Sequence, residues 1–174
     1  GSLRFPANFI LVGAMNPCPC GFLNDPVKQC ICTPAQIIRY QKRISGPLLD
    51  RVDIHLEVPR VKYEKLADER VAEESTSVRK RVEKARERQR KRFANLKIKT
   101  NAEMRLLDIK KYCQIDDKSR VLLKQAVNQL NLSARAYHRI LKLARTIADL
   151  AGQENIQPDY IAEAIQYRPK EVIY

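Results

Sequence analysis

The stretch that decides the fold is FILVGAMN, residues 9–16, which ends at the dipeptide Asn16-Pro17. An apolar run of this kind is typical of a strand covered on both faces in a parallel sheet, because a strand with one wet face alternates apolar and polar residues. Pro17 favours departure of the chain from the strand. We therefore expect Asn16 at the carboxyl end of a strand, the edge of an α/β sheet where ligands bind.

Four cysteines follow in a short loop, as two Cys-X-Cys pairs: Cys18, Cys20, Cys30 and Cys32. Each pair delivers two thiolates from one turn, so the four can close a tetrahedral zinc site. Free thiols and disulfides are the alternatives, and disulfides are disfavoured in an intracellular protein. We expect zinc in the loop of residues 17–32, and a place in the core for Cys113, which stands far away in an apolar context.

Beyond the loop, Thr33 and Gln36 form a capping-box pattern around Pro34, which predicts a short helix. Gly46-Pro47 ends that helix and predicts one further turn. Alternating residues over 54–58 then predict a second strand, and Pro59 follows it. Arg51 lies between the turn and this strand, where its simplest local role is an ion pair with a neighbouring Asp.

The net charge is +13 with a pI of about 9.7, and the excess is concentrated in one segment. Residues 60–99 hold 15 Lys or Arg against 7 Asp or Glu. Such a segment favours an anionic partner such as nucleic acid, although a solvated helix with i,i+4 ion pairs is the simpler alternative. The candidate DNA contacts are Arg79, Arg81, Lys84, Arg86, Arg88 and Arg90.

Helical periodicity continues to the C-terminus. It predicts helices over residues 63–74, from Ser77 onward, within 101–114, over 116–130, over 133–150 and from Pro158. Arg135 lies in the first turn of a helix capped by Ser133, where a cation is unfavourable. This placement implies an anionic partner elsewhere or a plain salt bridge. His55 and His138 belong to no metal or catalytic spacing, so we expect structural roles for them.

These motifs carry a resemblance to a known family. The patterns NPCPCG, CxCTPAQ and RYxxRISGPLLDRVDIHLEVP resemble the magnesium-chelatase-like AAA+ ATPases, and most closely the competence protein ComM family. The resemblance continues in VRKRVEKARERQ, LSARAYHRILKLARTIADLAG and EAIQYR, so it covers nearly the whole chain.

The resemblance implies roles for three residues in ATP hydrolysis. Asn16 is similar to the sensor 1 residue, which positions the attacking water or the γ-phosphate. Arg51 is similar to the arginine finger, which reaches the nucleotide of the neighbouring subunit and would be oriented by Asp50 and Asp53. Arg135 is similar to sensor 2, with Arg139 a weaker candidate for the same task.

The resemblance also implies a domain organisation. Residues 3–60 would form the C-terminal portion of an AAA+ α/β core with the cysteine loop, 61–100 a basic helical insertion or linker, and 101–174 a helical lid. The chain contains no GxxxxGK[ST] and no apolar strand ending in Asp-Glu. We therefore expect a C-terminal part of a longer protein that binds ATP and Mg, and no ATPase activity from this part alone.

The implied parent is a cytoplasmic hexameric ring, a helicase that moves branched or single-stranded DNA during recombination in natural transformation. A chelatase-type ATPase that remodels a protein partner for metal insertion keeps the same fold. A zinc-dependent DNA-binding module without ATPase activity is the alternative from another class. No apolar run is long enough to span a bilayer and no signal peptide is visible, so we expect a soluble protein without a membrane partner.

Overall fold

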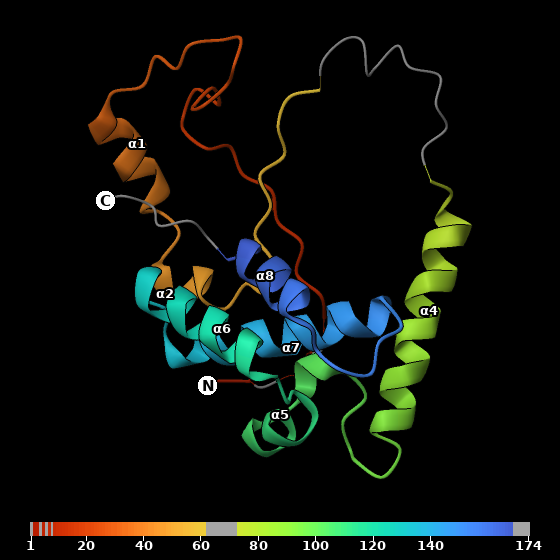
Figure 1. The fold of residues 1–174 in the computed structure, drawn as a ribbon. Coiled ribbons are helices and arrows are strands. Elements are labelled where there is room, and N and C mark those ends of the chain that lie inside the picture. The colour runs from red at the N-terminus through yellow and green to blue at the C-terminus, as the bar shows by residue number, and fades with distance from the viewer. Residues whose placement is uncertain (1, 4, 6, 8, 62–72, 169–174) are drawn as a thin grey trace. The chain divides into compact units, whose positions relative to one another are not determined.

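The structure is a computed structural model that describes residues 2, 3, 5, 7, 9–61 and 73–168 (Figure 1). The chain divides into two compact units that meet in sequence at Ile44 and Ser45. The described residues are mostly helical, and no helix among them is long and apolar enough to cross a membrane.

The first unit contains one helix, α1, Pro34–Gln41. Its predicted capping box is confirmed: Thr33 Oγ1 accepts from the Gln36 N–H at 3.3 Å, and Gln36 Oε1 accepts from the Thr33 N–H at 2.9 Å. At the other end, Gln41 Nε2 donates to the carbonyl oxygen of Pro17 at 3.1 Å. The helix is thereby tied to the start of the cysteine loop.

The two predicted strands are not formed within the described residues, so this part of the fold prediction is not confirmed. Residues 9–16 and 54–58 pair with no neighbouring strand there, and the one β-bridge described joins Ile115 and Ile156. A β-strand forms hydrogen bonds with the N–H and C=O groups of a neighbouring strand, and neither segment lies beside such a strand among the described residues. Their apolar side chains consequently stay in solvent, as Ile10 and Val12 do at 92% and 89% exposure.

The second unit begins with α2, Gly46–Leu49, a single turn after Ser45, which confirms the predicted break and turn. The basic helix α4, Ser75–Arg92, begins two residues before the predicted start at Ser77. The helix predicted over residues 63–74 lies almost wholly outside the described residues.

The rest of the second unit is a bundle of short helices. They are η1, Asn101–Glu103; α5, Leu106–Tyr112; α6, Asp117–Gln129; α7, Ala134–Leu150; and α8, Pro158–Gln166. The predicted cap at Ser133 is present, because Ser133 Oγ accepts from the Ala136 N–H at 3.1 Å, and the Asp116 carboxylate caps α6 by accepting from the Ser119 N–H at 2.8 Å. Both bonds satisfy N–H groups that a helix start leaves free.

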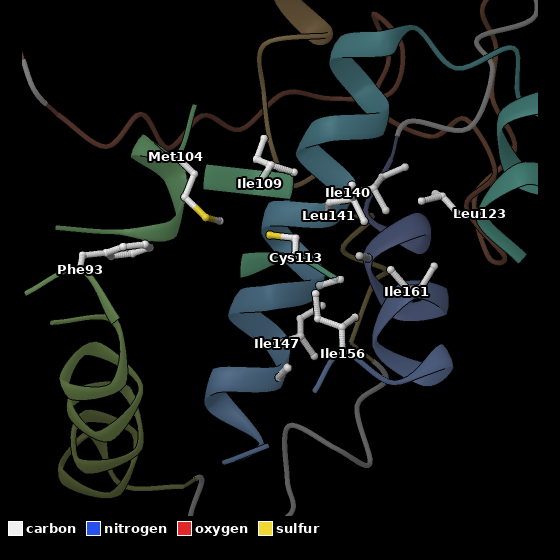
Figure 2. Close-up of a cluster of buried hydrophobic side chains, with 13 residues drawn as sticks. Phe93, Met104, Ile109, Cys113, Leu123, Ile140, Leu141, Ile147, Ile156 and Ile161 are labelled. Atoms are coloured by element: carbon white, nitrogen blue, oxygen red, sulfur yellow. The ribbon is translucent and has the colours of Figure 1, made fainter. Parts of the chain in front are cut away.

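α7 is the centre of this bundle and packs against α4, η1, α5 and α8, while α6 packs against α8 (Figure 1). Figure 2 shows the core, where Ile140 and Ile161 are fully buried. Cys113 is a core residue as predicted, and burial raises its pKa to about 12.

The buried face of α7 includes the apolar residues Ala136, Ile140, Ala144 and Ile147 and extends beyond them to charged residues. Leu150 is 42% exposed, whereas Leu141, Arg145 and Asp149 are buried. The reason is the packing of α4, which places the basic helix against the side of α7 that carries the two charged residues. Apolar periodicity alone cannot predict a buried face that includes charges.

Candidate functional site

The four cysteines of the loop converge on one point. Their four Sγ atoms all lie within 4.8 Å of one another. Cys18 lies 3.4 Å from Cys20 and 3.7 Å from Cys30, and Cys20 lies 3.5 Å from Cys30, Sγ to Sγ. Tetrahedral zinc with Zn–S bonds of about 2.3 Å separates its sulfurs by roughly 3.8 Å, so the four side chains fit such an ion.

The local sequence explains how the loop reaches this geometry. Gly21 adopts a φ of +82°, a conformation that glycine tolerates, and its N–H donates to the Cys18 carbonyl at 3.0 Å. A second turn forms around Asp25, whose Oδ1 accepts from the N–H groups of Val27 and Lys28, each at 2.8 Å. These two turns fold the segment between the cysteine pairs back on itself.

The thiols of the cluster differ in acidity. A hydrogen bond from the backbone N–H of Phe22 lowers the pKa of Cys20 to about 6, and burial raises the pKa of Cys32 to about 12. All four cysteines are free, and Sγ separations of 3.4 Å and more exceed the roughly 2.05 Å of a disulfide. A divalent cation is the partner that suits four converging sulfurs, because thiolates are its ligands.

Asn16 lies beside the cysteine loop. Its side chain is close to the first turn, and a Cβ added to Gly21 would lie 3.7 Å from Asn16 Cγ. Because residues 9–16 form no strand among the described residues, no strand end positions Asn16 here. Its assignment as sensor 1 stays a prediction.

Arg51 follows α2 and is exposed. Its N–H donates to the Leu48 carbonyl at 2.9 Å, which continues the turn, while its guanidinium pairs with no described side chain. The expected partner Asp53 is engaged elsewhere, because its carboxylate forms an ion pair with Arg139. The guanidinium of Arg51 is therefore available to an anion.

Arg135 occupies the first turn of α7, as predicted, and is also exposed. The other two arginines of this helix are bound: Arg139 pairs with Asp53, and Arg145 pairs with Asp149 at 3.2 Å. Among the arginines of α7, Arg135 is the one whose side chain has no partner in the described part of the chain. The salt bridge that would have explained its position is absent there.

The basic helix α4 presents a wide cationic surface. It carries nine Lys or Arg and two Glu, and it buries Ala85 and Gln89 against the bundle. All six candidate DNA contacts are exposed: Arg79, Arg81, Lys84, Arg86, Arg88 and Arg90. Arg81 is partly neutralised by Glu73 at 2.7 Å, and Arg90 by Glu87 at 3.3 Å. The other four side chains have no partner among the described residues.

A buried polar network, which the sequence did not predict, holds α4 on α7. Arg92 donates to both carboxylate oxygens of Asp149, at 2.7 and 2.5 Å, and to Asn101 Oδ1 at 2.9 Å. Asn101 Nδ2 in turn donates to Asp149 at 2.8 Å. One signal was present in the sequence: Asp149 lies in the last turn of a helix, where an acid is unfavourable without a cation nearby.

Arg168 is a second residue that the sequence analysis did not single out. It follows α8, is 4% exposed, and donates from Nη1 to the Val52 carbonyl at 3.2 Å. Its Nε is buried without a partner, and burial lowers the pKa of Arg168. No local pattern distinguishes it, because its partner lies 116 residues earlier.

The comparisons with known proteins cover nearly the whole chain. The family model for magnesium chelatase, subunit ChlI, matches residues 1–66, and the model for magnesium chelatase, subunit ChlI C-terminal, matches residues 72–168. Competence protein ComM of Haemophilus influenzae is 44% identical over 95% of this chain and 32% of its own length. Uncharacterized protein YifB of Escherichia coli is 40% identical over 95% of this chain and 32% of its own length. An uncharacterised protein of Mycobacterium tuberculosis is 36% identical over 97% of this chain and 33% of its own length.

The chain thus spans about a third of the length of these relatives. The two family models agree with the motifs that carried the resemblance, from the NPCPCG loop to the end of α8. The chain belongs to the magnesium chelatase-like family.

Proposed function

We propose that this chain is the C-terminal part of an ATP-driven AAA+ motor that assembles as a hexameric ring and acts on DNA. The family suggests an AAA+ ATPase. In this proposal Asn16 serves as sensor 1, Arg51 as the arginine finger and Arg135 as sensor 2. ATP and Mg are held mainly by residues outside this chain.

One observation carries the proposal: the two arginines assigned to nucleotide phosphates are exposed and unpaired, while the arginines around them are bound. Arg139, Arg145 and Arg168 each contact a carboxylate or a carbonyl. Arg51 and Arg135 have no side-chain partner among the described residues. A guanidinium can neutralise the charge of a transferred phosphoryl group only if no carboxylate of its own chain already occupies it.

The four-cysteine cluster is proposed to hold zinc in a structural role. Four sulfur ligands leave no open coordination position, which is the property of a structural site rather than a catalytic one. The ion would fix the loop of residues 17–32, which contacts Asn16 through the turn at Gly21. It takes no part in hydrolysis.

The surface of α4 favours DNA over a protein partner. Five of its cations have no partner among the described residues, and the helix has only two acidic residues. A chelatase-type ATPase that remodels a protein requires no such surface. The alternative nevertheless keeps the same nucleotide site, so nucleotide hydrolysis alone does not separate the two.

DNA-dependent ATP turnover of the full-length protein separates them. We expect branched or single-stranded DNA to raise the turnover number, and the stimulation to weaken as salt rises, because the contacts are made to phosphates. ATP turnover that is the same with and without DNA at low salt would contradict the motor on DNA and favour the remodelling ATPase.

A further inference from the structure

The segment that carries Arg51 is held by the helical bundle. Residues 50–55 belong to no helix or strand, and three contacts fix them. Asp53 pairs with Arg139 of α7, the Val52 carbonyl accepts from Arg168 at 3.2 Å, and the His55 N–H donates to the Tyr167 carbonyl at 2.9 Å. We name this set of contacts the clasp.

The clasp lies immediately next to the proposed finger. Val52 and Asp53 are the two residues after Arg51. On the other side, His55 Nε2 forms a hydrogen bond with the Leu49 carbonyl at 3.2 Å, which closes the segment into a compact turn. The two arginines of the clasp therefore contact the two residues that follow Arg51.

The helix that supplies Arg139 also carries Arg135, one turn earlier on the same face. The same helix therefore bears the proposed sensor 2 and forms an ion pair with the segment that carries the proposed finger.

The energetics favour a positioning role over a stabilising one for the ion pair. The side chain of Asp53 is 60% exposed and that of Arg139 is 24% exposed. Ion pairs with such access to water contribute about 0–1 kcal/mol to stability. The pair consequently adds little to the stability of the bundle, and together with the Arg168–Val52 and His55–Tyr167 hydrogen bonds it holds the segment that bears Arg51.

We propose that Arg139 and Arg168 are positioning residues that couple the arginine finger Arg51 to the helical bundle through the clasp. The inference rests on the proposed function of Arg51 and adds the residues that control its placement. It assigns Arg139 to Asp53 rather than to the nucleotide.

The test is steady-state ATP hydrolysis by the full-length protein with Asp53→Ala, Arg139→Ala, both together, and Arg139→Lys. We expect each alanine variant to lower kcat by about two- to fivefold with KM within twofold of wild type, because loss of a contact of about 1 kcal/mol lowers the fraction of correctly placed Arg51 by about that factor. The double variant should lose no more than the worse single variant, since both remove one contact. Arg139→Lys should recover part of kcat, because it keeps the charge.

A matched control is available on α6, where Arg120 pairs with Asp117 at 2.6 Å, also in solvent. Asp117→Ala and Arg120→Ala should leave both kcat and KM unchanged. Arg168 is buried, so its replacement risks unfolding, and the test therefore uses the exposed pair. Thermal unfolding of each variant confirms that the fold is intact.

Two outcomes would overturn the inference. Wild-type kcat in Asp53→Ala and Arg139→Ala would show that the clasp does not position the finger. A raised KM with normal kcat in Arg139→Ala would make Arg139 a nucleotide contact. Arg51→Ala, assayed in parallel, separates failure of the proposed finger from failure of the clasp. Full turnover in Arg51→Ala would show that the finger assignment is wrong. Loss of turnover in Arg51→Ala, together with wild-type kcat in the clasp variants, would overturn only the positioning role of the clasp.

Discussion

Arg92 and Asp149 form a bidentate ion pair, 2.7 and 2.5 Å, that joins the basic helix α4 to the central helix α7. The Asp149 side chain is fully buried and also pairs with Arg145 at 3.2 Å, while the side chain of Arg92 is 16% exposed. The cationic surface of α4 is thereby attached to the helix that bears Arg135.

The first prediction concerns this pair. Asp149→Ala leaves the buried Arg145 and the partly buried Arg92 without their carboxylate, so we expect the free energy of unfolding to fall by about 3–5 kcal/mol. Urea unfolding of the chain, followed by circular dichroism, measures it. Asp117→Ala, which removes an exposed partner, should cost less than about 1 kcal/mol. An equal fall in the free energy of unfolding in the two variants would show that the buried network stabilises the fold no more than an exposed ion pair does.

The second prediction concerns the cysteine cluster. Replacement of Cys18 and Cys20 by Ser should abolish bound zinc and loosen residues 17–32, because the ion and the loop fold depend on each other. Elemental analysis and hydrogen exchange measure the two effects. Cys113→Ala, which changes a core thiol of the other unit, should keep one zinc per chain. Protein that never contains zinc, even when it is supplied, would argue for free thiols.

The third prediction concerns DNA. Glutamine at four of the five unpaired cations of α4 should weaken DNA binding by the full-length protein. It should also reduce the slope of log affinity against log salt concentration by up to about 0.9 for each lost phosphate contact. These cations are Arg79, Lys84, Arg86 and Arg88. The matched control carries glutamine at four exposed lysines of α5 and α6, namely Lys110, Lys111, Lys118 and Lys124. Identical salt slopes in both variants would place the DNA contact elsewhere.

The fourth prediction concerns Arg135. A charged hydrogen bond to phosphate contributes about 1.5–3 kcal/mol, so Arg135→Ala should weaken ATP affinity of the full-length protein by roughly tenfold to a hundredfold. Equilibrium binding of a fluorescent ATP analogue measures it. Lys118→Ala on α6 serves as the control and should bind normally. Wild-type affinity in Arg135→Ala would remove this residue from the nucleotide site.

Local patterns predicted much of the helical part correctly. The capping box at Thr33 and the caps at Asp116 and Ser133 are present because a cap depends on residues within one turn. The cysteine cluster was predictable for the same reason, since close spacing brings the thiols together. The family was predictable because its motifs are long and continuous.

Long-range pairing was not predictable from the same patterns. The strands expected at residues 9–16 and 54–58 depend on neighbouring strands, and none is present among the described residues. The Arg92–Asp149 and Arg168–Val52 contacts were missed because they join residues that are 57 and 116 positions apart. The boundaries predicted at residues 60 and 100, and the roles of Asn16, Arg51 and Arg135, stay predictions.

The measurement that tests the central claim most directly is ATP turnover and ATP binding by the full-length protein with Arg51→Ala. A finger acts mainly in the transition state, so its loss should lower kcat by about three orders of magnitude or more while the Kd for ATP changes little. Turnover close to that of wild type would contradict the assignment of Arg51 and, with it, the proposed hydrolytic site between subunits.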